Sequence, residues 1–185
     1  MEKSTTSQTS FLDRASVCLA TGFYVSNIPA GLIDRFKYHA HGQALIQKKL
    51  TGAGLLGSIQ GALTYLLLPP FLANAWWMIL LALVFAVRVS ARAEKALNTH
   101  DDPRIVIDEW IGTWVALWGM GQGRWLTVVL GVALFRLFDV FKGPIGNRLQ
   151  KLPGGWGVAM DDVYAGFAAN LGWRIGVLFV PGAFS

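Results

Sequence analysis

Charged residues are scarce in this chain, and their scarcity indicates an environment other than water. Of its 185 residues, 15% are charged and 54% are hydrophobic, and the mean hydropathy is +0.45. A soluble domain of this length would carry roughly a quarter charged residues. Long apolar segments separated by short basic ones therefore predict an integral membrane protein with one compact domain.

Cysteine is also nearly absent, because Cys18 is the single one. This count excludes an intramolecular disulfide and a metal site built from cysteines. Residues 1–14 are expected to form a polar N-terminal tail that lacks the apolar core and cleavage pattern of a signal peptide. Residues 15–185 are expected to form a single helical membrane domain.

The net charge of +5 does not indicate a nucleic-acid partner. No segment combines dense Lys and Arg with interleaved aromatic residues, as a nucleic-acid-binding groove does. The basic residues lie in short stretches between apolar segments, including a basic insert at 34–49. Such stretches are typical of cytoplasmic loops, and they favour anionic membrane lipid as a partner.

The apolar segments predict an all-α fold. They lie at 15–33, 52–68, 72–89, 105–120, 125–141 and 163–180. Some are shorter than the ~20 residues with which a helix crosses a bilayer. The chain is therefore expected to be a small polytopic helical membrane protein with about four to five membrane-embedded helical segments, some of them short or re-entrant.

Carboxylates interrupt this apolar background at three places. Asp108 and Glu109 begin one apolar segment, Asp139 lies near the end of another, and Asp161 and Asp162 precede the last. Carboxylates beside apolar sequence lose hydration and repel one another. A bound cation, or a function that needs the charge, is the usual compensation.

The basic loops predict that these carboxylates meet at one membrane face. With the loops at 34–49, 88–104 and 142–160 in the cytoplasm, all three acidic segments reach the cytoplasmic side. Taken singly, an aspartate at a helix N-terminus is usually a cap. Their convergence instead favours a Mg²⁺ site, since Mg²⁺ prefers carboxylate ligands and can polarise a phosphoryl oxygen.

Cationic residues near the carboxylates are candidates for binding a transferred phosphate. Arg136 and Lys142 each lie three residues from Asp139, so a continuing helix would place all three on adjoining faces. Arg104 lies just before the first acidic pair. An arginine–aspartate pair is more often structural than catalytic, and it is the convergence of the acidic segments that favours the functional interpretation.

Three motifs resemble the phosphatidylglycerophosphatase A family in their order and spacing: DPRIVIDEWIGTW at 102–114, FRLFDVFKGPIG at 135–146 and GGWGVAMDDVYAG at 154–166. That family consists of small Mg²⁺-dependent inner-membrane phosphatases, which convert phosphatidylglycerophosphate into phosphatidylglycerol and inorganic phosphate. The resemblance implies catalytic and metal-binding roles for Asp108, Glu109, Asp139, Asp161 and Asp162. It implies phosphate binding by Arg136 and Lys142, with Arg104 as a further candidate.

One segment departs from the family pattern. Leu55 stands where a Pro-Gly-Thr-x-Gly-Ser-like turn has its threonine, whereas Gly57 and Ser58 keep the frame and are candidate phosphate contacts. The basic segment at 34–49 looks like an insertion relative to the family pattern. The expected function is a multi-pass lipid phosphatase of the bacterial inner membrane with its site on the cytoplasmic face. The alternatives are a small cation- or proton-coupled transporter and a weakened family member that binds lipid.

Overall fold

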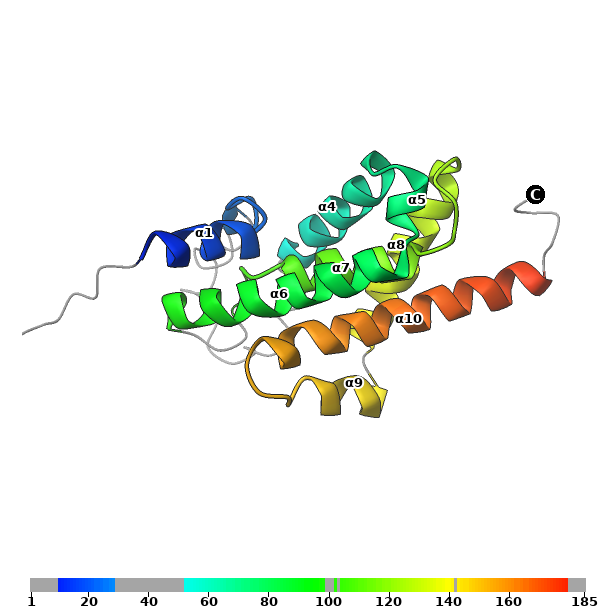
Figure 1. The fold of residues 1–185 in the computed structure, drawn as a ribbon. Coiled ribbons are helices and arrows are strands. Elements are labelled where there is room, and N and C mark those ends of the chain that lie inside the picture. Colours follow the sequence, from blue (N-terminus) through cyan, green and yellow to red (C-terminus); the bar gives the residue numbers. More distant parts are fainter. Residues whose placement is uncertain (1–9, 29–51, 99–101, 103, 142, 180–185) are drawn as a thin grey trace, which may run out of the picture.

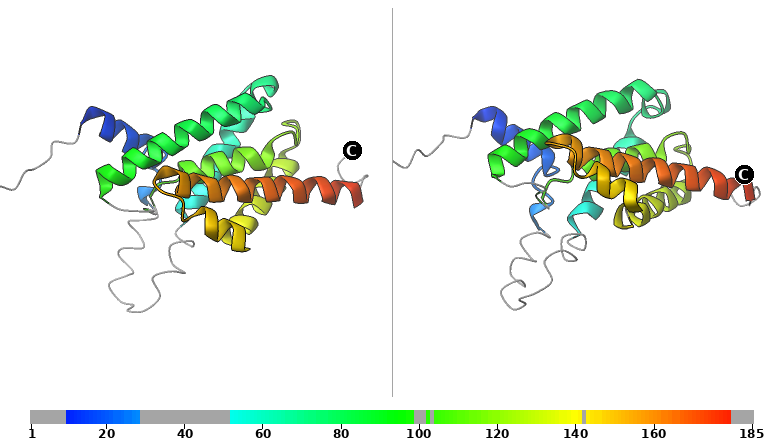
Figure 2. Two further views of the ribbon diagram at one scale, coloured as in Figure 1. Left: turned by 60° about the horizontal axis from the view of Figure 1, so that its bottom comes forward. Right: turned by 90° about the horizontal axis from the view of Figure 1, so that it is seen from below.

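The computed structural model describes residues 10–28, 52–98, 102, 104–141 and 143–179. Within these ranges the fold is all-helical, as predicted, and contains no strand. Its helices are α1 (Phe11–Ala20), α4 (Ala53–Leu67), α5 (Pro70–Ala73), α6 (Trp76–Leu97), α7 (Ile107–Leu117), α8 (Trp125–Val140), α9 (Gly143–Leu149) and α10 (Gly155–Phe179). The long helices α6 and α10 run side by side, and α9 lies against the first part of α10 (Figures 1 and 2).

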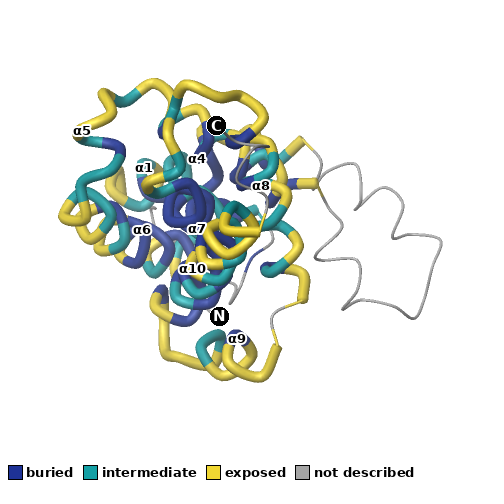
Figure 3. The backbone as a smooth tube through the Cα atoms, turned by 90° about the vertical axis from the view of Figure 1, so that its right-hand side faces the viewer, coloured by how far each residue is buried: buried dark blue, intermediate teal, exposed yellow. Residues whose placement is uncertain are grey.

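Helix α7 forms the centre of the molecule. Helices α4, α6, α8 and α10 pack around it, and its tube is the most continuously buried part of Figure 3. The side chains of Ile111, Trp114 and Leu117 are at most 2% exposed. Because α7 has 11 residues, it is about 16 Å long, which is shorter than the ~30 Å hydrocarbon core of a bilayer, and it is enclosed by the neighbouring helices.

Glycines allow the neighbouring helices to approach α7 closely. A Cβ atom added at Gly61 of α4 would lie 2.5 Å from the carbonyl oxygen of Trp110. One added at Gly166 of α10 would lie 2.4 Å from the carbonyl oxygen of Gly112. No residue other than glycine fits at these contacts without displacing backbone. They fix the positions of α4 and α10 along α7.

The ends of the helices follow local sequence signals. Ser10 and Asp13 form a capping box that begins α1. Pro69 and Pro70 end α4, as predicted, because neither can donate the next helical hydrogen bond, and Pro70 begins α5. Asn98 ends α6 in a left-handed conformation with φ of 50°.

Several boundaries differ from the sequence predictions. Helix α1 begins at Phe11, inside the expected tail, and is followed from residue 21 by turns instead of continuing as a span. Helix α6 continues through most of the loop expected at 88–104. Helix α9 and the start of α10 occupy much of the loop expected at 142–160, which places Asp161 and Asp162 in the second turn of α10. The insert at 34–49 lies outside the described residues.

Arg174 in α10 stabilises the C-terminal end of α7. Its Nε donates to Asn170 Oδ1 at 2.7 Å, and its Nη2 donates to the carbonyl oxygen of Trp118 at 3.3 Å. Asn170 Nδ2 in turn donates to the carbonyl oxygens of Ala116 at 2.9 Å and Trp118 at 2.7 Å. These contacts satisfy carbonyl groups that have no partner within α7, and they place a positive charge at the negative end of its dipole.

Among the described residues, α6 is the one helix long and apolar enough to cross a membrane. Helix α4 is apolar but shorter. The all-helical class is thus confirmed, while the count of about four to five embedded segments stays a prediction.

Candidate metal and phosphate site

Three carboxylates converge where α7 begins. Asp108 and Glu109 lie in the first turn of α7, and Asp162 faces them from α10. One oxygen from each lies within 4.8 Å of the other two. The convergence follows from the close packing of α7 on α10, because a Cβ atom at Gly112 would lie 2.8 Å from the carbonyl oxygen of Asp162. These three residues are called the acidic cluster below.

The acidic cluster carries negative charge that its hydrogen bonds do not fully compensate. Asp108 Oδ1 and Glu109 Oε2 are buried and have no hydrogen-bond partner. Burial, followed by the charges of Glu109 and Asp162, raises the pKa of Asp108 well above its ordinary value. Burial also raises the pKa of Glu109. A cation would relieve both the lost hydration and the mutual repulsion.

The donor set of the acidic cluster fits a hard divalent cation. All three side chains offer carboxylate oxygens, which Mg²⁺ prefers to nitrogen or sulfur ligands. Two of the oxygens that lack a hydrogen-bond partner belong to the cluster itself. The residues that the sequence predicted as metal ligands are therefore brought together in part, with Asp108, Glu109 and Asp162 at the centre.

Asp139 joins the acidic cluster through Arg136. Arg136 Nη1 lies 2.9 Å from Asp139 Oδ2, one turn along α8, and 3.8 Å from Glu109 Oε1. The side chain of Arg136 is 20% exposed, so its charge is largely enclosed between the two carboxylates. The predicted pairing of Arg136 with Asp139 is thus present, and it lies directly beside Glu109.

Asp161 is buried beside the acidic cluster but is not one of its three members. Its Oδ1 accepts a hydrogen bond of 3.1 Å from the backbone N–H of Asp162. Its charge also contributes to the raised pKa of Asp108. Asp161 therefore affects the cluster in two ways: its hydrogen bond positions the backbone of Asp162, and its negative charge acts on Asp108.

Gly54, which sequence reasoning did not select, lies against the site. A Cβ atom added there would lie 2.4 Å from Glu109 Oε1 and 2.8 Å from Arg136 Nη1. The sequence pattern that could have identified Gly54 is its helical spacing with Gly57 and Gly61. In the structure, all three glycines face α7 or the site. The absent side chain leaves the space that the carboxylate and the guanidinium occupy.

Gly57 and Ser58, predicted as phosphate contacts, have packing roles in the structure. A Cβ atom at Gly57 would lie 2.6 Å from the carbonyl oxygen of Val106. Ser58 is fully buried, and its hydroxyl donates to the carbonyl oxygen of Gly54 at 2.9 Å. Leu55, where a threonine was expected, is 48% exposed.

Of the two remaining predicted cations, Arg104 lies within the described residues and pairs with Asp102. Arg104 forms a fork with Asp102, with Nε 2.8 Å from Oδ1 and Nη2 2.7 Å from Oδ2. Lys142 lies outside the described residues. Since α8 ends at Val140, the helical stripe expected to carry Arg136, Asp139 and Lys142 stops before its last member.

Comparison with known proteins relates the chain to a family of lipid phosphatases. The model of the family described as phosphatidylglycerophosphatase A matches residues 40–177, which include the acidic cluster and Arg136. A protein of Bacteroides thetaiotaomicron, provisionally named a phosphatidylinositol-3-phosphatase, is 39% identical over 63% of this chain and 75% of its own length. No solved structure matches the chain.

Two relatives carry the name of the family itself. The phosphatidylglycerophosphatase A of Escherichia coli is 27% identical over 69% of this chain and 83% of its own length. That of Haemophilus influenzae is 31% identical over 63% of this chain and 73% of its own length. Because the family model also matches well over half of the residues, the chain belongs to the phosphatidylglycerophosphatase A family.

Proposed function

We propose that the protein is a Mg²⁺-dependent phosphatase that hydrolyses the terminal phosphomonoester of phosphatidylglycerophosphate, releasing phosphatidylglycerol and inorganic phosphate. The observation that carries the proposal is the acidic cluster beside Arg136, in which Asp108 Oδ1 and Glu109 Oε2 are buried without a hydrogen-bond partner. The relatives named phosphatidylglycerophosphatase A supply the substrate.

Asp108, Glu109 and Asp162 would hold the Mg²⁺ ion. When bound, Mg²⁺ supplies neutralisation of phosphate charge and a water molecule with a lowered pKa. A carboxylate at the site accepts the proton of the attacking water, because carboxylates are the bases within reach. Asp161 holds the backbone of Asp162 in place through their hydrogen bond.

Arg136 is the group we assign to the phosphate. A guanidinium offers two parallel N–H donors to phosphate oxygens and stays charged even when enclosed. Asp139 Oδ2 holds Arg136 in an ion pair at 2.9 Å, and phosphate would meet the guanidinium beside Glu109. Arg104, Lys142, Gly57 and Ser58 stay predicted phosphate contacts, and Gly57 and Ser58 also have packing contacts.

We also propose that the protein crosses the bacterial inner membrane several times and has its site on the cytoplasmic face. Large apolar side chains are exposed on several helices, including Leu67 on α4, Trp125 on α8 and Phe179 on α10. An apolar surface of this extent is typical of contact with lipid. Arg88 and Arg92 lie in the half of α6 that leads toward the start of α7, so the positive-inside rule places the acidic cluster near the cytoplasm.

A second candidate substrate is a phosphatidylinositol phosphate. The relative from Bacteroides thetaiotaomicron, at 39% identity, carries a phosphatidylinositol-3-phosphatase name. Both candidates present a phosphomonoester on a glycerophospholipid, so the acidic cluster and Arg136 would act on either in the same way. The two candidate substrates differ in their headgroups alone.

The test is phosphate release by the purified protein in detergent. Phosphatidylglycerophosphate and phosphatidylinositol 3-phosphate are supplied separately, each with Mg²⁺ or with EDTA. We expect release from phosphatidylglycerophosphate with Mg²⁺ and none with EDTA. Asp162→Asn should abolish release, while Asp13→Asn, a matched change in the cap of α1, should not. Equal phosphate release with Mg²⁺ and with EDTA would contradict the proposed dependence on Mg²⁺.

The transporter alternative makes an opposite prediction. It requires cation or proton flux into sealed vesicles that depends on Asp162 and occurs without lipid phosphate. Flux of this kind, together with no phosphate release from either lipid, would replace the phosphatase proposal.

A further inference from the structure

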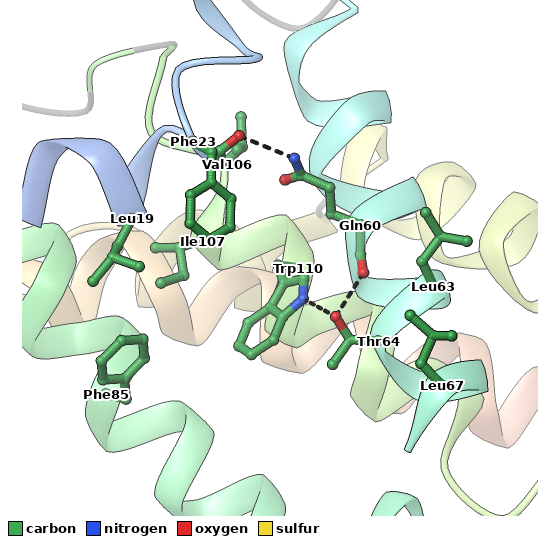
Figure 4. Close-up of a pocket in the computed structure, with 11 residues that line it drawn as sticks. Leu19, Phe23, Gln60, Leu63, Thr64, Leu67, Phe85, Val106, Ile107 and Trp110 are labelled. Carbon is green, nitrogen blue, oxygen red and sulfur yellow. Dashed lines mark hydrogen bonds between the residues drawn. The ribbon is translucent and has the colours of Figure 1, made fainter.

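An apolar cavity of about 380 Å³ lies between α1, α4, α6 and α7. Its volume is in the range of roughly 300–1,000 Å³ that is usual for sites of small ligands. Apolar side chains from all four helices and the turn after α1 surround it (Figure 4), among them Leu19, Phe23, Leu63, Leu67, Phe85 and Ile107. None of the residues described as lining it is charged.

The polar side chains in the wall of the cavity donate hydrogen bonds to one another and to backbone carbonyl groups. Trp110 Nε1 donates to Thr64 Oγ1 at 2.9 Å, and this hydroxyl donates to the carbonyl oxygen of Gln60 at 2.9 Å. Gln60 Nε2 donates to the carbonyl oxygen of Gly22 at 3.1 Å (Figure 4). These bonds already use the indole N–H of Trp110 and the hydroxyl hydrogen of Thr64, and hydrocarbon would leave them intact. The chemistry of the wall therefore selects an apolar occupant.

Several apolar side chains that line the cavity are also exposed at the protein surface. Leu67 is 82% exposed, Phe23 71% and Phe85 45%. Phe85 lies on α6, the described helix that is able to cross a membrane. In the membrane location proposed above, the cavity would open toward the hydrocarbon of the bilayer.

The cavity and the acidic cluster are built on the same two helices. Ile107, in the cavity wall, directly precedes Asp108 in the chain. On α4, Gly54 contacts the site and Gln60 lines the cavity, a separation of about 9 Å along the helix axis. Gly57 packs on Val106 between them. One lipid can reach both places, because its headgroup and its acyl chains extend in different directions from the glycerol. The headgroup would lie at the acidic cluster and an acyl chain in the cavity.

The backbone beside the cavity is strained. Phe23 and Tyr24 have φ of 58° and 63°, although neither is glycine. The turn is held by the N–H of Phe23, which donates to the carbonyl oxygen of Cys18 at 2.7 Å, and by Gln60 at Gly22. Strain of this kind persists where the surroundings enforce it, and such residues concentrate at ligand sites.

We propose that this cavity binds one acyl chain of the lipid phosphate whose phosphomonoester reaches the acidic cluster. The inference rests on the proposed function and extends it, because it assigns the enzyme a preference for long-chain lipid over short-chain analogues. The preference arises from burial of methylene groups against the apolar wall.

Leu63→Trp tests the inference by filling the cavity. Its matched control is Leu66→Trp, since Leu66 is on the same helix, is 40% exposed and does not line the cavity. Each variant is assayed with dioleoyl and dihexanoyl phosphatidylglycerophosphate in the same detergent. Leu63→Trp should raise KM for the dioleoyl lipid about tenfold with kcat unchanged, as for the loss of one or two buried methylenes. The dihexanoyl lipid and the Leu66→Trp control should show no such change.

Two outcomes would contradict the inference. An unchanged KM in Leu63→Trp, or the same rise for both chain lengths, would overturn the acyl-chain site. Leu19→Phe provides a second filling variant, should Leu63→Trp fail to fold. If wild-type protein hydrolyses neither lipid, the proposed function fails, and the cavity is then tested by crosslinking to phosphatidylglycerol with a photoreactive acyl chain. Absence of label on the cavity segments of α4 and α7 would reject the inference independently.

Discussion

Replacement of Gly54 by alanine should disable the site while the protein stays folded. The added Cβ atom would lie 2.4 Å from Glu109 Oε1, whereas ordinary contact begins at 3.4 Å, so the carboxylate must move by 3.4 − 2.4 = 1.0 Å. Arg136 Nη1, at 2.8 Å, must move as well. A displacement of about 1 Å at a catalytic group costs on the order of 100-fold in rate, or about 2.7 kcal/mol in the barrier.

The same substitution should affect stability much less than activity. Alanine is better than glycine inside a helix by about 1 kcal/mol, while overpacking costs about 1–3 kcal/mol. The net loss for Gly54→Ala is then about 0–2 kcal/mol, against a total stability of roughly 5–15 kcal/mol for a typical domain. The displaced atoms at Gly54 are side-chain ends, which can move more readily than backbone.

The assay measures kcat, KM and the half-saturating Mg²⁺ concentration of the purified variant, with its unfolding followed in the same detergent. Gly176→Ala is the matched control, because Gly176 is also helical and a Cβ atom there would meet nothing within 4 Å. The control should retain full activity. Turnover of a folded Gly54→Ala protein within about threefold of wild type, a barrier change below about 0.7 kcal/mol, would refute the reasoning.

Three further predictions concern the charged groups. Asp162→Asn should weaken Mg²⁺ binding by at least about tenfold, measured by the stabilisation of the folded protein as Mg²⁺ is added, because one of the three clustered carboxylates becomes neutral. In EDTA, the free energy of unfolding should fall as pH rises from about 4 toward the raised pKa of Asp108, since the folded state there retains a proton that the unfolded state has lost. Saturating Mg²⁺ should reduce that fall, and a flat profile in EDTA would contradict the burial of an uncompensated charge. Arg174→Met should lower the free energy of unfolding by about 1–2 kcal/mol through the lost hydrogen bonds to Asn170 and Trp118, and an unchanged midpoint in urea would contradict this.

Local signals in the sequence were sufficient for much of the fold. The Pro69-Pro70 pair marked the end of α4 because proline removes a backbone donor. The apolar segment at 125–141 corresponds to α8 within one residue. The start of α10 was placed too late, because Gly155 and Gly157 indicated a loop when read locally. In the fold, a Cβ atom at Gly155 would lie 2.1 Å from the carbonyl oxygen of Val87, so this glycine permits helix packing.

The candidate site was predictable in its chemistry but not in its internal order. Unusual charge in apolar sequence indicated all five carboxylates. Which three of them cluster depends on the register of α7 against α10, which is fixed by the contact of Gly112 with Gly166. Contacts between residues far apart in sequence also define Gly54 as part of the site. A pattern in one segment carries no information about such distances.

The buried position of α7 explains why the carboxylates and Arg174 lie at its opposite ends. A helix enclosed by protein cannot leave its terminal backbone groups to water, so polar or charged groups of the protein stabilise both ends. Asp108 and Glu109 lie at the positive end of the α7 dipole, and Arg174 and Asn170 bind carbonyl groups at the negative end. The two ends are about 16 Å apart, and Arg174 is exposed to solvent, which screens its charge over this distance. Loss of Arg174 should therefore lower stability without shifting the Mg²⁺ dependence, whereas loss of a clustered carboxylate should shift it strongly.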